Sequence, residues 1–271
     1  MSGSANGTGT AVGAGVRRVD ATRARLVSTA ERLFAARGVE AVSLREISRE
    51  SGARNAIATQ YHFTDRAGVL AAIMAKHEPV VEAARHALLD RYEAVGGAGA
   101  SHAESGAGLA GTVAGTSPAG VGIRDLAGAL VRPLAAKLGD PDGGPEFLQI
   151  HAEILDRTPG EGRRGNGRGP VTGAGLVPML LPAGGTSIGR WRALIDPLIE
   201  RDAVRLHRRF TAIVHSAVEL GRRARTGPHT DDRLFTSYLV DVVTAILSFP
   251  VSEETRRLAD ERDEARHRRG R

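Results

Sequence analysis

Two stretches in the second half of the chain carry apolar residues at alternating spacings of four and three. They consist of Leu206, Phe210, Ile213, Ala217 and Leu220, and of Phe235, Leu239, Val242, Ile246 and Phe249. This spacing places one apolar residue on the same side of each helical turn, whereas a half-buried strand would alternate at every second residue. Two successive helices of this kind pair within one chain or form a four-helix bundle between two chains. We therefore predict an all-α protein, with these seam residues as candidate dimer contacts.

Three stretches rich in glycine and other small residues interrupt the helical pattern: residues 1–17, 96–120 and 158–189. Such composition is typical of flexible arms and loops. Elsewhere, apolar periodicity and capping residues predict the helices, with Gly38 and Gly52 as stops and Asp65 or Thr64 as a cap. The expected helices with two predicted ends span about 20–37, 44–51, 55–61, 123–138 and 146–156. A further helix begins at 64–66, and the chain restarts at Glu78-Pro79 with a helix that continues to about 93. Asp196-Pro197 opens another helix, one more begins at 231, and a short solvated helix follows Ser252.

The positive charge of the chain comes almost entirely from arginine. The net charge is +6, and Lys76 and Lys137 are the only lysines. The planar fork of arginine suits phosphate oxygens and guanine edges, although a GC-rich genome would also favour arginine codons. The chain has no cysteine, which excludes disulfides, thiolate zinc sites and cysteine nucleophiles. No apolar run approaches the ~20 residues that cross a bilayer, and the start lacks a signal-peptide pattern, so we expect a cytoplasmic protein.

The segment from Ser43 to Phe63 has the pattern of a helix-turn-helix. Ser43-Leu44-Arg45-Glu46 forms a capping box at the start of a short helix, which Gly52 ends. The second short helix begins with small residues between hydrogen-bonding groups, which suits entry into a groove about 12 Å wide. Residues 17–66 hold ten arginines and six acidic residues, a local net charge of +4. This concentration of positive charge indicates a nucleic-acid partner.

Together these features resemble the DNA-binding domain of TetR-family regulators. The resemblance rests on Ala30-Glu31-Arg32-Leu33-Phe34, Arg37-Gly38, Ser43-Leu44-Arg45-Glu46-Ile47, Ser51-Gly52, Tyr61-His62-Phe63, Arg66 and Leu70. It implies a homodimer with an N-terminal three-helix DNA-binding domain over 18–66 and a C-terminal helical ligand-binding and dimerisation bundle over 67–251. A flexible arm over 1–17 and a charged tail over 252–271 flank these domains. The stretch from Gly52 to Phe63 is one residue longer than the common family version.

The resemblance also implies which residues contact DNA. Ser43 falls at the phosphate-contacting cap of the family, and Tyr61 and His62 fall in its aromatic motif. Arg66 stands where the family usually has lysine, and Gln60 stands where it has a phosphate-binding tyrosine. The candidate DNA contacts are Ser43, Arg45, Arg54, Asn55, Ala56, Thr59, Gln60, Tyr61, His62 and Arg66. The residues expected in the core are Leu33, Phe34, Ile47 and Phe63. For Arg45 and Arg49, the alternative to DNA contact is a position on a solvated face.

The effector site is expected among the helices after Pro79. Its candidate residues combine apolar walls with a few polar groups, and ordinary core packing is the alternative for each. They are Phe147, His151, Ile154, Trp191, His207, Phe210 and Thr211. The expected partners are a double-stranded DNA operator, a second copy of the chain and an unidentified small hydrophobic or amphipathic effector, with no membrane, cofactor or metal.

An enzyme is the main alternative class of protein. His151-Ala152-Glu153 echoes the His-x-Glu of zinc deaminases, but the chain has no cysteine to complete such a site. It also lacks His-Glu-x-x-His, a Walker loop and Gly-x-Ser-x-Gly. We therefore predict a non-enzymatic regulator, and repressor is preferred to activator only because it is the habit of the family. A DNA-binding activator or architectural protein without an effector is the second alternative.

Overall fold

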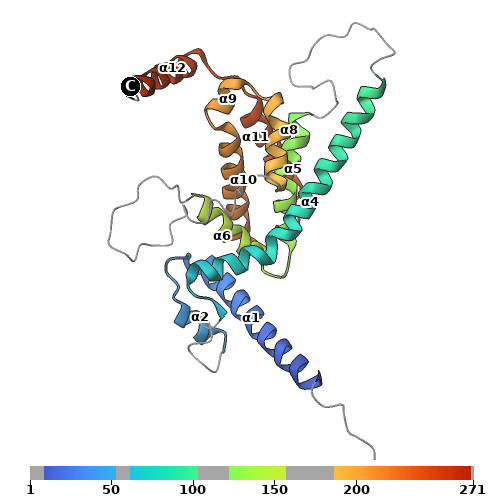
Figure 1. Ribbon diagram of the computed structural model, residues 1–271, viewed down its shortest axis with the longest axis vertical. Helices are drawn as coiled ribbons and strands as arrows, with labels where there is room; N and C mark the ends of the chain where they lie inside the picture. Colours follow the sequence, from blue (N-terminus) through green and yellow to red (C-terminus); the bar gives the residue numbers. More distant parts are fainter. Residues whose placement is uncertain (1–8, 53–61, 103–121, 157–185, 270–271) are drawn as a thin grey trace, which may run out of the picture.

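The computed structural model describes residues 9–52, 62–102, 122–156 and 186–269. Over these residues the chain is helical and contains no β-strand, which confirms the predicted all-α fold. Figure 1 shows the first helices grouped at one end of the molecule and the later helices bundled at the other. The principal helices are α1 (Gly9–Arg37), α2 (Leu44–Glu50), α4 (Arg66–His102), α5 (Ile123–Ala135), α6 (Gly144–Asp156), α8 (Ser187–Ile195), α9 (Arg201–Arg205), α10 (Arg208–Arg225), α11 (Arg233–Ser248) and α12 (Glu253–Arg269).

The N-terminal group of helices packs around the apolar face that the spacing in α1 predicts. Leu26, Ala30 and Phe34 of α1 are fully buried, and they share one core with Ile47 of α2 and Phe63. The helix begins at Gly9 rather than near residue 20, so residues 9–17 of the expected flexible arm are helical. Once a helix is nucleated, each further residue adds a hydrogen bond, so a helix readily extends further along the chain. Figure 1 shows this first part of α1 extending away from the other helices.

Helix α4 is continuous where the sequence predicts a restart. Asp65 caps it, with its Oδ1 accepting from the Gly68 backbone N–H at 2.8 Å. Pro79 lies inside the helix, where proline removes one hydrogen bond and favours a kink rather than ending the helix outright. Figure 1 shows α4 changing direction along its length before it rises beside the bundle. Buried Val81 and Leu89 join the core beyond the proline, and this packing favours continuation. The helix extends to His102, so residues 96–102 are not the loop that the sequence predicts.

The C-terminal bundle has α10 packed against α6 and α11 packed against α5. The expected helices over 123–138 and 146–156 are present as α5, which is followed by the 3-10 helix η2 (Ala136–Gly139), and as α6. Trp191 of α8 is fully buried at the centre. Its Nε1 donates to the Leu126 carbonyl oxygen at 2.8 Å, so its one polar atom is satisfied within the core.

The single helix expected after Asp196-Pro197 is divided into three pieces. The 3-10 helix η3 (Asp196–Leu198) is followed by α9 and α10. The chain is extended at Ile199 (φ −104°, ψ 153°), and His207 has the left-handed value φ 58°. Glu200, at the first break, accepts a hydrogen bond from the Val251 backbone N–H at 2.8 Å. A contact with a residue 51 positions away in the chain therefore holds this break in place.

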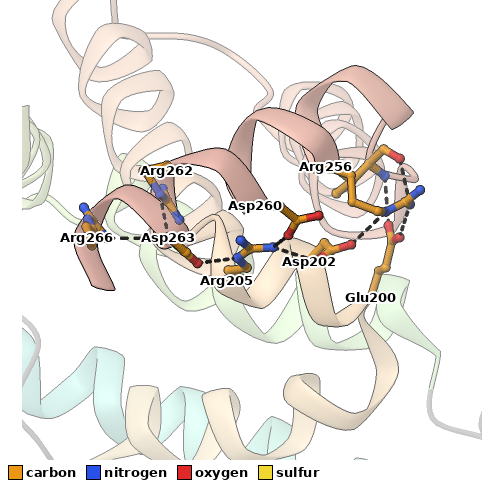
Figure 2. Close-up of polar contacts among 9 residues, drawn as sticks. Glu200, Asp202, Arg205, Arg256, Asp260, Arg262, Asp263 and Arg266 are labelled. Atoms are coloured by element: carbon orange, nitrogen blue, oxygen red, sulfur yellow. Dashed lines mark hydrogen bonds and ion pairs between the residues drawn. The ribbon is translucent and has the colours of Figure 1, made fainter. Parts of the chain in front are cut away.

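Helix α12 is attached to α9 and to Glu200, which precedes it, by ion pairs that Figure 2 shows. They join Arg256 to Glu200 and Asp202, and Arg205 to Asp260 and Asp263, at distances of 2.6–2.8 Å. Ala259 is the buried side chain of this helix. The solvated C-terminal helix is therefore present, but it is longer than expected, at 17 residues, and bound to the bundle. Within the described ranges, no single helix is long and apolar enough to span a membrane, and α11 and α12 pass that test only as a pair bent by 59°.

Candidate nucleic-acid interface and effector site

The predicted capping box is present at the start of α2. Ser43 has an extended backbone, its Oγ accepts from the Glu46 backbone N–H at 3.2 Å, and Glu46 Oε2 accepts from the Ser43 N–H at 3.4 Å. Arg37, at the end of α1, pairs with Glu46 at 2.7 Å. The Arg37 hydrogen bond and then the Ser43 backbone bond lower the pKa of Glu46. This carboxylate therefore both caps α2 and ties it to α1.

Two glycines with left-handed backbones frame α2. Gly38 (φ +84°) directly follows α1, and Gly52 (φ +66°) lies in the turn after α2. Both stops are predicted by the sequence, because glycine adopts this conformation without the penalty of a Cβ. The second helix of the motif is expected directly after Gly52. The candidate DNA contacts Arg54, Asn55, Ala56, Thr59, Gln60 and Tyr61 lie outside the described residues.

The remaining candidate DNA contacts lie at the two ends of this motif. Ser43 and Arg45 are exposed on the first turn of α2, and Arg45 has no ion-pair partner in the described part of the chain. Arg49, one turn later, is held within 4.0 Å of Glu46 and Glu50. His62 is half-buried beside Phe63, which is buried as predicted.

Arg66 is engaged within the protein. Its Nη1 pairs with Glu40 at 2.6 Å, and its Nη2 donates to the carbonyl oxygens of Glu40 and Val42 at 3.3 and 3.2 Å. The guanidinium therefore fastens the loop between α1 and α2 to the start of α4. Its expected phosphate contact stays a prediction. Replacing Arg66 would disturb this loop as well as any DNA contact, so it is a poor test of phosphate binding.

A buried polar cluster joins the N-terminal helices to the bundle. Glu31 of α1 contacts Lys76 Nζ and His77 Nε2 of α4, each at 2.9 Å, and Lys76 also pairs with Asp142 ahead of α6 at 2.9 Å. Burial lowers the pKa of Lys76, but hydrogen bonds to Glu31 and Asp142 outweigh this effect and raise it. The sequence patterns do not predict this cluster. Its one signal is that Glu31 stands four residues after Val27, on the apolar side of α1.

A second contact connects α6 directly to the end of α1. The Val39 backbone N–H lies 3.1 and 3.3 Å from the two carboxylate oxygens of Glu153. Gly38 packs on the same carboxylate, because a Cβ built there would lie 3.5 Å from Glu153 Oε1. Glu153, which the sequence places only in a possible enzyme motif, therefore supports the turn between α1 and α2.

Part of the expected effector site comes together on α6. Phe147 stacks on His77 with a centroid distance of 4.7 Å and meets the ring of His151 at 5.5 Å. Burial, with a smaller contribution from the positive charge of Arg85, lowers the pKa of His151 to about 4. Its imidazole is therefore neutral at pH 7. Ile154 and Trp191 are also buried in this core.

The other three effector candidates do not join this group. His207, Phe210 and Thr211 lie exposed around the break between α9 and α10. Their exposure sets them apart from the buried residues of α6. The left-handed backbone at His207, which the apolar spacing does not reveal, separates α9 from α10 at this point.

Most of the seam residues belong to the core of the single chain. Ile213, Ala217, Leu220 and Leu239 are at most 7% exposed, so they cannot supply contact area to a second copy. Leu206, Phe235, Val242 and Ile246 are half-buried. Phe210 and Phe249 are the exposed members of the set, at 37% and 71%. The buried members therefore pack within the single chain, and a dimer contact stays a prediction for the exposed ones.

No family model, curated protein or solved structure matches the chain. Within the described ranges, no group of three or more histidine and acidic side chains is placed to hold a metal ion. The interpretation of the site therefore rests on the residues and contacts given above.

Proposed function

We propose that the chain is a DNA-binding transcriptional regulator of the TetR type. It binds a palindromic operator as a homodimer in the cytoplasm, without catalysis, and a small-molecule effector releases it as a repressor. The observation that carries this proposal is the capped helix α2, fastened to α1 by Arg37–Glu46 and ended by Gly52. A short capped helix of this kind matches the supporting half of a helix-turn-helix.

The distribution of charge supports DNA as the partner. Residues 17–66 carry a net charge of +4. At the start of α2, the exposed Arg45 has no carboxylate partner among the described residues and is available to a phosphate. Arginine forks bind phosphate oxygens through two parallel hydrogen bonds. Contacts of this kind provide affinity that falls with salt concentration.

The contacts of α6 support control by an effector. One side of α6 presents Phe147 and His151 to α4, while Glu153 supports the turn after α1. An effector can shift the DNA-binding equilibrium only if it binds one shape of the protein better than the other. Because α6 contacts both regions, a ligand that displaces it would also move the α1–α2 turn.

The test is selection of bound sequences from a pool of random DNA duplexes, followed by titration of the selected duplex. We expect a sequence with two inverted half-sites, about 34 Å apart or a multiple of that distance. Arg45→Ala should weaken binding to all sequences and reduce the slope of log affinity against log salt by about 0.9. Arg91→Ala, which removes an exposed arginine of α4, should leave both unchanged. Enrichment of no sequence, or binding without dependence on salt, would refute the proposal.

A further inference from the structure

A cluster of polar side chains, of which Arg85 and Ser187 are buried and the others partly buried, lies where α4 meets α6 and α8. It consists of Glu78, Glu82 and Arg85 of α4, His151 of α6 and Ser187 of α8, and is called the Arg85 cluster below. Arg85 is 3% exposed and Ser187 is fully buried. A charged guanidinium in such a place needs hydrogen-bond partners for its donors.

The partners of Arg85 occupy only one corner of its guanidinium. Nη1 lies 3.2 Å from Glu82 Oε1 and donates to Ser187 Oγ at 2.8 Å. Glu82 is itself held by the Ser187 backbone N–H and hydroxyl, at 2.8 and 2.6 Å. Nε is buried and has no partner, and none of the contacts of Arg85 in the described residues uses Nη2. The edge formed by Nε and Nη2 therefore has no hydrogen-bond partner among the described residues.

Other unpartnered atoms are buried around Phe147, next to this cluster. Nδ1 of His151 and Nδ1 of His77 are both buried without a hydrogen-bond partner within the described ranges. The two rings flank Phe147 at 4.7 and 5.5 Å, and His151 lies close enough to Arg85 for its charge to affect the imidazole. Three unsatisfied polar atoms in one region are unusual for a folded protein. A bound molecule that offers an acceptor to Arg85 Nε would satisfy one of them.

The unpaired Nε–Nη2 edge of Arg85 indicates the chemistry of that molecule. An Nε–Nη2 edge offers two parallel N–H donors, which match the two oxygens of a carboxylate. Glu82 and Glu78 lie near the same guanidinium, so a ligand with two negative charges would be repelled more than one with a single charge. Phe147 provides an aromatic surface for an apolar body beside the acid group.

We propose that Arg85 binds the carboxylate of a small organic acid, with the apolar part of the acid against Phe147 and His151. The identification of this acid as the effector rests on the proposed function. Binding of the acid to the free protein does not depend on that function. The ligand class is therefore a monocarboxylate with an aromatic or aliphatic body, rather than a phosphate ester or an amine.

The test is calorimetric titration of the full chain, without DNA, using matched probes. Benzoate and octanoate are compared with benzyl alcohol and 1-octanol, which keep the apolar body, and phenyl phosphate replaces the carboxylate with a dianion. We expect at least one carboxylate to bind roughly tenfold or more tightly than its matched alcohol, and phenyl phosphate to bind more weakly than benzoate. Equal binding of acid and alcohol, tighter binding of phenyl phosphate, or no binding of either carboxylate would overturn the proposal.

Variants test whether Arg85 is the residue responsible. Arg85→Lys keeps the charge but removes the Nε–Nη2 edge, and Arg85→Gln removes both, so each should lose roughly tenfold or more in carboxylate affinity. Glu78→Gln removes a neighbouring negative charge and should tighten carboxylate binding, a gain that a damaged fold would not produce. Arg91→Gln, on the exposed side of the same helix, is the matched control. Unchanged affinity in folded Arg85→Lys together with no gain in Glu78→Gln would refute the assignment.

A final measurement separates this inference from the proposed function. The selected DNA duplex is titrated with the protein in the presence and absence of the carboxylate that binds. Release of DNA supports both proposals. Carboxylate binding without any DNA binding refutes the regulator and keeps the Arg85 site, whereas DNA binding without carboxylate binding refutes the Arg85 site alone.

Discussion

Glu78 is a side chain whose ionisation should affect the stability of the fold. Burial, and then the negative charge of Glu82, raise its pKa to about 6 from an ordinary value of 4.5. A carboxyl group with a raised pKa in the folded state stabilises the fold fully below pH 4.5, and that contribution is lost as the pH rises through about 6. His151 has the opposite sign, because its lowered pKa stabilises the neutral imidazole above pH 6.5 and this contribution is lost as the pH falls toward 4.

Replacing Glu78 with glutamine should therefore stabilise the protein near neutral pH. We expect a gain of about 1–2 kcal/mol in the free energy of unfolding at pH 7.5, because the variant has no charge to bury. The gain should shrink between pH 6 and 4.5 as wild-type Glu78 becomes protonated. Urea unfolding at several pH values measures this difference. Glu254→Gln, which changes an exposed carboxylate of α12, should show no such trend, and a gain that is constant across this pH range would contradict the explanation.

Residues that act within one turn of a helix are the ones that the sequence predicts correctly. The Ser43–Glu46 capping box, the cap at Asp65 and the stop at Gly38 depend on neighbours a few positions away. The contacts that join distant segments were not predicted. Glu31 reaches His77 across 46 positions, and Arg85 reaches Ser187 across 102. Nothing in local spacing indicates which distant polar group will face a buried one.

Among the helices, α6 has the most direct role in joining the two parts of the molecule. It packs along α10 in the bundle and also contacts α1 and α4. Glu153 provides a polar connection to the α1–α2 turn through the Val39 N–H. A hydrogen bond between a carboxylate and a backbone amide is stronger than one between neutral groups. The position of α2 should therefore depend on the position of α6.

Glu153→Ala should loosen the N-terminal helices. We expect a loss of about 1–3 kcal/mol in the free energy of unfolding, because the Val39 N–H is left without this acceptor. Hydrogen exchange of the Val39 amide, measured together with thermal unfolding, should show faster exchange in the variant. Glu254→Ala, at the exposed position in α12, provides the control. An unchanged exchange rate at Val39 would show that the connection through Glu153 does not support this turn.

Helix type was easier to predict than helix ends. The apolar faces of α1, α10 and α11 follow from spacing alone. The break at His207 and the continuation of α4 through Pro79 do not, because each depends on packing. Extended backbone at Ile199 lies beside Glu200, which contacts Val251 far along the chain. Local propensity favours a continuous helix there, and the tertiary contact overrides it.

On the scale of the whole molecule, three of the large exposed apolar side chains lie on α11 or at its C-cap. Leu234 is 82% exposed, Tyr238 65% and Phe249 71%, and their spacings of 4 and 11 residues place them along one side of the helix. The buried residues of α11, such as Leu239 and Val243, belong to the core that α11 forms with α5 and α10. One chain therefore uses one face of α11 for its core and leaves a second apolar face open to solvent.

This open face is the surface on which a homodimer should form. A regulator that reads two half-sites needs two copies whose motifs are fixed about 34 Å apart, and a two-fold interface brings the same apolar stripe from each copy together. Leu234→Glu combined with Tyr238→Glu would place like charges in that contact, so the variant should be monomeric by light scattering at concentrations where the wild type is dimeric. Leu258→Glu, which adds the same charge at a half-exposed apolar position of α12, should remain dimeric.

The monomeric variant should also lose its preference for two half-sites over one, because the second site then adds no avidity. A double variant that stays dimeric would place the interface elsewhere on the molecule.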